Sequence, residues 1–231
     1  MEKNKQITLY GNIAFALLIL IATIVFMQTQ IDPYITKTIA SVLFVLCGVF
    51  NFAILHKYHK YNGYLKSMVL LTGLVFAMIG DILLIDYFIL GAIFFAIGHI
   101  FFLIYFCLIY KFSWVDIIVF LSLITFAMLI IFLYPHFNFD GMLPIIVVYA
   151  IIISSMLAKA AGNYIENKGT ANLIALLGAL LFFFSDMMLL FFRFGGRTLI
   201  FDYLCVYTYY PAEFLLALSI LLHKNTFKTK K

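Results

Sequence analysis

The sequence predicts an all-α integral membrane protein, in which a single domain over residues 1–231 forms a bundle of eight transmembrane helices. Of the 231 residues, 66% are hydrophobic and only 11% are charged, so a soluble domain of this length would leave much apolar surface in water. Apolar runs of about 20 residues, the length that crosses a bilayer as a helix, recur along the chain. Lysine and arginine residues gather in alternate connections, which predicts how the helices are oriented.

Each expected span is an apolar run bounded by polar residues, glycine or proline, with aromatic residues clustered near the run ends. Only Asp86 and Tyr87 separate the third and fourth runs, but residues 65–110 are too many for one crossing. In chain order, the separators are residues 32–33, 57–63, 86, 111–114, 135–141, 162–169 and 195–196. The expected spans are residues 7–27, 37–56, 65–85, 88–110, 114–134, 142–160, 170–192 and 202–222.

The first run follows Lys3 and Lys5, as the apolar part of a signal peptide would. It is too long for that role, and no small-residue cleavage site follows it. We therefore expect it to stay attached as a transmembrane helix.

The basic residues predict that both termini are cytoplasmic. Twelve lysines lie in the N-terminus, the C-terminal tail and the second, fourth and sixth connections, whereas Lys37, Arg193 and Arg197 lie on the opposite side. Such an asymmetry is typical of the positive-inside rule. We expect an integral protein of the plasma membrane, which is the inner membrane in a bacterium. Because the net charge of +5 is sorted by connection, it does not indicate nucleic-acid binding.

We expect neither a cofactor nor a metal. No histidine or cysteine cluster has the spacing of a familiar metal site, and no nucleophilic serine motif is present. The cysteines are odd in number and lie within apolar runs, so they are interpreted as packing residues rather than disulfides or zinc ligands. They are Cys47, Cys107 and Cys205.

Two aspartates lie deep inside apolar runs, each after a small residue. Asp81 lies in LTGLVFAMIGDILLI and Asp186 in LLGALLFFFSDMMLLFF. A carboxylate in the hydrocarbon costs several kcal/mol, so such residues usually face a polar interior and mark chemistry or transport. Both are predicted to lie within two turns of the outer end of their helices.

Other ionisable side chains are expected at similar depths. His99 and Glu213 lie about 11 residues into inward-running spans, which is roughly 16 Å at the helical rise. Tyr209 shares a helix face with Glu213, four residues further on, and Lys37 begins the second span at the outer surface. Because nearly all ionisable residues inside the spans are expected in the outer half of the bilayer, they predict a polar cavity there.

Each of these residues also has a structural interpretation. Asp81 and Asp186 would then pair with Lys37, Arg193 or a tyrosine, while His99 would be a hydrogen-bonded interior residue. Glu213 would balance a buried cation. Glycines within the spans are interpreted as points of close helix packing; they are Gly73, Gly80, Gly91, Gly98 and Gly178.

Taken together, these motifs resemble the YhhN family of membrane proteins. The matching features are a lysine that begins the second span, Gly-Asp in the third, a histidine in the fourth, Ser-Asp in the seventh and a tyrosine pair in the eighth. Many relatives have Gln or His where this chain has Glu213. The residues that carry the resemblance are Lys37, Gly80, Asp81, Gly91, Phe94, His99, Tyr105, Gly178, Phe182, Ser185, Asp186, Tyr209, Tyr210 and Glu213.

The resemblance implies a lysoplasmalogenase, which cleaves the vinyl ether of a lysophospholipid to a fatty aldehyde and glycerophospho-ethanolamine or -choline. That reaction needs a protonated acid and a second carboxylate, by analogy with the paired carboxylates of glycoside hydrolysis. Asp81 and Asp186 are the implied acid/base pair, and His99 would orient one of them or a water. Tyr209 and Tyr210 would bind the carboxylates or the glycerol.

Three alternatives remain open at this point. A metal held by Asp81, Asp186 and His99 would change the chemistry. A proton-coupled transporter would use the same acids as proton carriers, but it predicts helix breaks near the site, and the prolines inside the spans are expected near helix starts. A lipid-binding scaffold would show no turnover. In the hydrolase interpretation, Lys37 binds the lipid phosphate and the partners are the lysophospholipid and the bilayer.

Overall fold

The computed structural model describes the backbone of residues 2–59 and 64–222 and the side chains of residues 5–57 and 64–222. Within these ranges all regular structure is helical, and eight helices are long and apolar enough to cross a membrane. The prediction of an all-α membrane protein is therefore confirmed. The helices are α1 (Glu2–Gln28), α2 (Pro33–His59), α3 (Tyr64–Leu83), α4 (Phe88–Ile109), α5 (Trp114–Leu133), α6 (Leu143–Glu166), α7 (Thr170–Phe194) and α8 (Leu199–Leu222).

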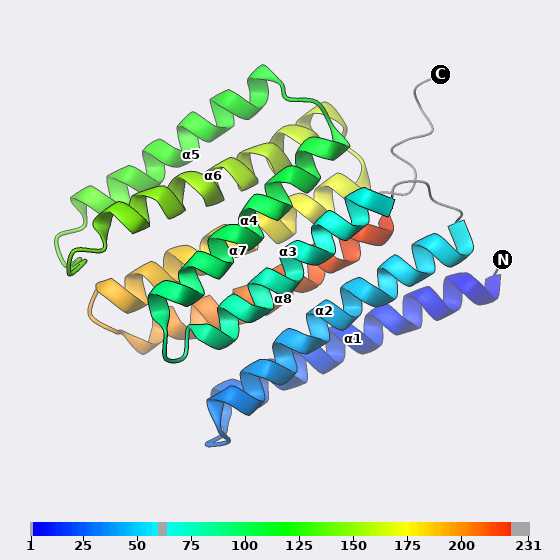
Figure 1. Ribbon diagram of the computed structural model, residues 1–231, viewed down its shortest axis with the longest axis horizontal. Helices are drawn as coiled ribbons and strands as arrows, with labels where there is room; N and C mark the ends of the chain where they lie inside the picture. The colour runs from blue at the N-terminus through cyan, green and yellow to red at the C-terminus, as the bar shows by residue number, and fades with distance from the viewer. Residues whose placement is uncertain (1, 60–63, 223–231) are drawn as a thin grey trace.

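Successive helices run in opposite directions, so the start of α1 and the end of α8 lie at the same end of the bundle (Figure 1). We call the opposite end, with the connections at residues 29–32, 84–87, 134–142 and 195–198, the predicted outer end. Its orientation in the membrane remains a prediction. Lys60 and the basic tail, on which that prediction partly depends, lie outside the described residues.

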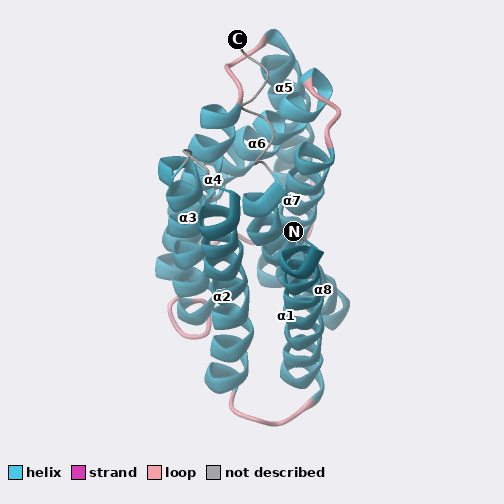
Figure 2. Cartoon of the chain, turned by 90° about the vertical axis from the view of Figure 1, so that its right-hand side faces the viewer, coloured by secondary structure: helices cyan, strands magenta, loops and turns pink. Residues whose placement is uncertain are grey.

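Helix α8 forms the centre of the packing, because it contacts α7, α2, α1 and α3. Two helix pairs lie on opposite sides of the bundle, α1–α2 on one side and α5–α6 on the other (Figures 1 and 2). Helix α5 packs chiefly against α6 at the edge. Buried polar side chains lie on the inner faces of α2, α3, α4, α7 and α8, and others lie on α6.

Glycines allow α3 and α4 to approach closely. A Cβ added to Gly80 would lie 3.0 Å from the Gly91 carbonyl oxygen, and one added to Gly98 would lie 3.2 Å from the Gly73 carbonyl oxygen. Between α7 and α8, a Cβ on Gly178 would lie 3.1 Å from a backbone carbonyl. The prediction that these glycines are close-packing points is confirmed, as expected where helices in lipid pack through small residues.

The expected division between α3 and α4 is confirmed: residues 84–87 form a turn between two separate helices. Several helix boundaries and positions differ from the sequence-based expectation. Pro211, expected near a helix start, lies in the middle of α8. Lys159, counted as a residue of a basic connection, lies inside α6, which continues to Glu166.

Lys159 is buried because Asp116 neutralises it. Its ammonium donates to Asp116 Oδ2 at 2.8 Å and to the Lys111 carbonyl at 2.8 Å. Asp116 also accepts a hydrogen bond from the Ser113 backbone in the capping box that begins α5. This ion pair, at the end opposite the predicted outer end, joins α5 to α6.

Candidate active site between the helices

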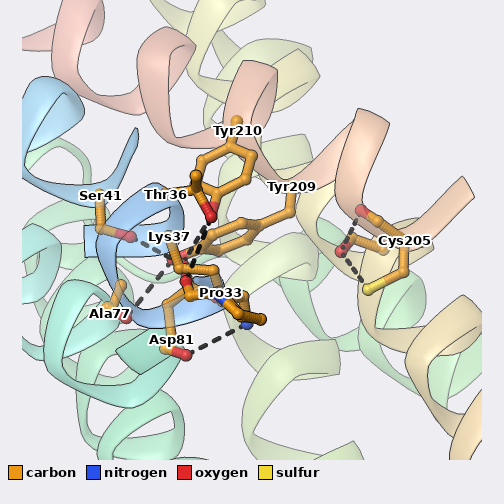
Figure 3. A network of polar contacts seen from close by, with 10 residues as sticks. Pro33, Thr36, Lys37, Ser41, Ala77, Asp81, Cys205, Tyr209 and Tyr210 are labelled. Atoms are coloured by element: carbon orange, nitrogen blue, oxygen red, sulfur yellow. Dashed lines mark hydrogen bonds and ion pairs between the residues drawn. The ribbon is translucent and has the colours of Figure 1, made fainter. Parts of the chain in front are cut away.

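Asp81 lies near the end of α3, and side chains of α2 and α8 bind its carboxylate (Figure 3). The Lys37 ammonium lies 2.9 Å from Asp81 Oδ1 and 3.2 Å from the Asp81 backbone carbonyl. The hydroxyls of Ser41 and Tyr210 donate to Asp81 Oδ2 at 2.6 Å and 2.9 Å. Both carboxylate oxygens of Asp81 therefore have donors within the protein.

Lys37 faces the interior, which differs from its expected position at the outer surface. Helix α2 begins at Pro33, so Lys37 lies one turn inside the helix. The side chains of Lys37 and Asp81 are only 14% and 5% exposed. The structural alternative, in which Asp81 pairs with Lys37, thus describes the observed contact.

Asp186, in α7, has different neighbours. The Tyr149 hydroxyl, from α6, donates to Asp186 Oδ2 at 2.6 Å. His99 Nε2, from α4, lies 3.7 Å from the same oxygen, and neither imidazole nitrogen makes a hydrogen bond within the described part of the chain. A small rotation brings His99 into hydrogen-bond range, as catalytic pairs often tighten when substrate binds.

A pocket leads to Asp186 from the side of the bundle. It contains about 570 Å³ of empty space, counted with its open mouth, and its polar side chains are Asp186 and Tyr149. The remaining lining is apolar and comes from α4, α6, α7 and the α3–α4 turn. Its most exposed lining residues, Ile89 on α4 (47%) and Ile145 on α6 (43%), indicate that the mouth lies between these two helices.

Aromatic rings join the surroundings of the two aspartates. Phe95 lines the Asp186 pocket and packs edge-on against Tyr209, with ring centroids 5.6 Å apart. Phe182 packs against both His99 and Tyr209, at 4.5 Å and 5.4 Å. Because Asp81 does not line the pocket, the contacts place the acids in two adjoining groups rather than in one shared polar cavity.

Tyr209 and Glu213 lie within electrostatic reach of both Asp81 and Asp186. The Tyr209 hydroxyl donates to the Ala77 carbonyl at 3.4 Å and also lies near the Glu213 carboxyl, whereas the Tyr210 hydroxyl binds Asp81. Glu213 is fully buried, and among the described residues neither of its oxygens accepts a hydrogen bond of normal geometry, although Tyr209 is close. Such a group costs about 1–3 kcal/mol, which is typical of residues kept for function.

The donor sets do not fit a metal ion. In residues 2–59 and 64–222, no three His, Cys, Asp or Glu side chains converge in the way that a metal requires. Asp81, Asp186 and His99 in particular do not form a shared ligand set, because Asp81 contacts Lys37 instead.

Two side chains that bind the aspartates, Ser41 and Tyr149, were not predicted from the sequence. The sequence does single out Tyr149, since it is the one polar side chain in the run IIVVYAIII. It does not single out Ser41, because a serine four residues after a lysine is common on helix faces. The Asp116–Lys159 pair was also missed, although Ser113 and Asp116 have the spacing of a capping box.

The fold and the buried acids define a class: a helical membrane-spanning protein with ionisable groups between its helices. Within that class, the chain belongs to the YhhN family, whose model matches residues 52–220. The predicted family resemblance is thus confirmed. Asp81, His99, Asp186, Tyr209 and Glu213 lie in the matched region, and Lys37 precedes it. Comparison with curated proteins and with solved structures gives no match.

Proposed function

We propose that the protein is a membrane-embedded hydrolase that cleaves the vinyl ether bond of a lysoplasmalogen. Membership of the YhhN family is consistent with this activity. The observation that carries the proposal is the apolar pocket that opens between α4 and α6 and has Asp186 among its few polar side chains. Apolar walls suit the start of an alkenyl chain, and a carboxyl group beside them can protonate its first double bond.

Asp186 is assigned the role of acid and base. The Asp186 carboxyl gives its proton to the β carbon of the vinyl ether, and an oxocarbenium ion forms. Water then adds to the neighbouring carbon and returns a proton to Asp186, which leaves a hemiacetal. The hemiacetal breaks its carbon–oxygen bond to glycerol as its hydroxyl proton moves to the glycerol oxygen, and a fatty aldehyde is released.

The contacts of Asp186 support this role. Burial among apolar side chains disfavours a charged carboxyl group, so a proton donor is best kept in such surroundings. The Tyr149 hydrogen bond fixes the orientation of the carboxyl group. His99 is near enough to hold either Asp186 or the attacking water.

Asp81 is assigned the role of the second carboxylate that the reaction needs, and it acts through its negative charge. Its oxygens are occupied by Lys37, Ser41 and Tyr210, so direct proton transfer to substrate is disfavoured. The Asp81 group adjoins the Asp186 pocket, because Tyr209, next to the Tyr210 that binds Asp81, packs against Phe95 of the pocket wall. In this role Asp81 favours the cationic intermediate without contacting it.

The test is aldehyde release from a lysoplasmenylethanolamine by purified protein in detergent. Asp186→Asn and Asp81→Asn should each lose activity, whereas Asp140→Asn, in an exposed turn, should not. Full activity in Asp186→Asn would remove the acid from the mechanism, and absence of aldehyde from the wild-type protein would reject the hydrolase.

A proton-coupled transporter is the second candidate, and Pro211 favours it. This proline lies between Tyr210 and Glu213 in the continuous helix α8, and it lacks the N–H that would donate to the Tyr207 carbonyl. A transporter would use such a weak point in a helix near its acids. In proteoliposomes, uptake of a lipid or small solute driven by a pH gradient, without aldehyde formation, would support this candidate.

A further inference from the structure

A second hollow adjoins the Asp186 pocket at the predicted outer end. It contains about 820 Å³ of empty space, counted with its open side, and its polar lining comes from Asp86, Tyr87 and Arg193. The two hollows share Phe88, Ile89 and Met142, so they lie side by side. One part is apolar and the other carries charges of both signs.

The two charges are available to a ligand. The Arg193 guanidinium lies over the Phe88 ring at 4.8 Å, and no carboxylate in the described residues pairs with it. Asp86, an exposed residue, accepts a hydrogen bond from the Tyr34 hydroxyl and likewise has no basic partner there. An unpaired cation and an unpaired anion on one hollow are complementary to a zwitterion.

The spacing along α7 matches the proposed substrate. Asp186 and Arg193 are seven residues apart, which places them on the same helix face and about 10 Å apart along the axis. In a lysoplasmalogen, seven bonds join the vinyl β carbon to the phosphorus, or about 9 Å at the reach per bond of an extended chain. A phosphate at Arg193 therefore leaves the vinyl ether beside Asp186.

We propose that this second hollow is a headgroup subsite for a zwitterionic lysophospholipid, in which Arg193 binds the phosphate and Asp86 binds the ammonium. The inference rests on the proposed function and deepens it. Arginine suits this role because its planar fork can bind two phosphate oxygens at once. It also replaces Lys37 as the phosphate ligand, since Lys37 is engaged by Asp81.

Binding tests the subsite without requiring turnover. The ligand is a non-hydrolysable 1-O-alkyl lysophosphatidylethanolamine, titrated into purified protein while its thermal stabilisation is followed. Arg193→Gln should weaken binding about tenfold or more, as expected for a charged hydrogen bond. Arg197→Gln, at an exposed neighbouring position, is the matched control and should leave binding unchanged. Equal effects of the two variants, or none, would overturn the proposal.

Two further ligands test the contact between Asp86 and the ammonium, and test whether free phosphate binds at the same place. Asp86→Asn should weaken binding of the ethanolamine lipid but not of 1-O-alkyl lysophosphatidic acid, which lacks the ammonium. Inorganic phosphate alone should not stabilise the protein, because the tail supplies most of the affinity. Stabilisation by phosphate equal to that by the lipid would identify an anion site instead.

Kinetics separate this inference from the proposed function. With lysoplasmenylethanolamine, Arg193→Gln should raise KM about tenfold and change kcat little. With 1-alkenylglycerol, which has no phosphate, the variant should match the wild type. A fall in kcat at constant KM would overturn the subsite. If the wild-type protein binds the lipid but releases no aldehyde, the hydrolase is rejected and the subsite stands.

Discussion

The ion pair between Lys37 and Asp81 allows the structural and functional roles of Asp81 to be separated. Lys37→Met removes the ammonium and keeps most of the side-chain volume. At 2.9 Å, and with an effective dielectric constant of about 20, the gross attraction is about 6 kcal/mol. Ser41 and Tyr210 continue to donate to Asp81, so we expect a net loss of about 3 kcal/mol, at the low end for a broken buried pair.

The double variant Lys37→Met/Asp81→Asn should recover much of this stability, because it leaves neither charge buried alone. For a chain of this size, a loss of 3 kcal/mol lowers the unfolding midpoint by about 6–12 °C. Circular dichroism during heating in detergent measures this midpoint. Lys111→Met, at an exposed lysine, is the control and should change the midpoint little.

Activity of the double variant then decides the role of Asp81. If Asp81 acts by its charge, as proposed, the refolded double variant stays inactive in aldehyde release. If Asp81 only balances Lys37, activity returns together with stability. Stability losses that simply add in the double variant would refute the premise that the two residues form a coupled pair.

Three further changes test the rest of the site. Asp186→Asn should lower aldehyde release by about 10²–10⁴-fold, as expected for a lost general acid, with an unchanged unfolding midpoint. Gly162→Ala should lower that midpoint strongly, because its Cβ would lie 1.7 Å from Asp116 Oδ1, whereas Gly169→Ala, with its nearest contact at 3.7 Å, should lower it less, through the N-cap of α7 alone. Glu213→Met should raise the midpoint by removing a buried carboxyl group that lacks hydrogen bonds, and a loss of activity in the same variant would assign it a function.

The helices could be predicted from the sequence because crossing a bilayer imposes a length and a composition on each of them. The depth of a residue in the bilayer could also be predicted, since the rise per residue converts its position in the sequence into a distance from the helix end. On this basis Asp81, His99 and Asp186 are all expected between helices; the structure buries Asp81 and His99 and leaves the Asp186 side chain 11% exposed where it lines the pocket.

Which side chains meet could not be predicted, because helices in lipid are apolar on every face. A helix such as α4 carries no polar stripe to show which side turns inward, so its rotation is set by packing. The Gly80–Gly91 approach fixes α3 against α4 and leaves Asp81 turned toward α2 and α8. His99 faces Asp186 for the same reason, and neither contact follows from spacing within one helix.

The contacts between α4 and α6 favour access to Asp186 from one end of the bundle. Away from the predicted outer end, Asn163 of α6 donates to the Phe106 carbonyl of α4 at 2.9 Å, and Lys159 donates to the Lys111 carbonyl just beyond α4. Toward the predicted outer end the pocket lies between the same helices. A hydrolase needs only this single opening, because its lipid enters and its products leave by the same side. If a transporter also opened between α4 and α6 at the other end, it would break the contacts of Asn163 and Lys159, and since both groups are buried, that step would leave polar atoms unpaired at about 1–3 kcal/mol each.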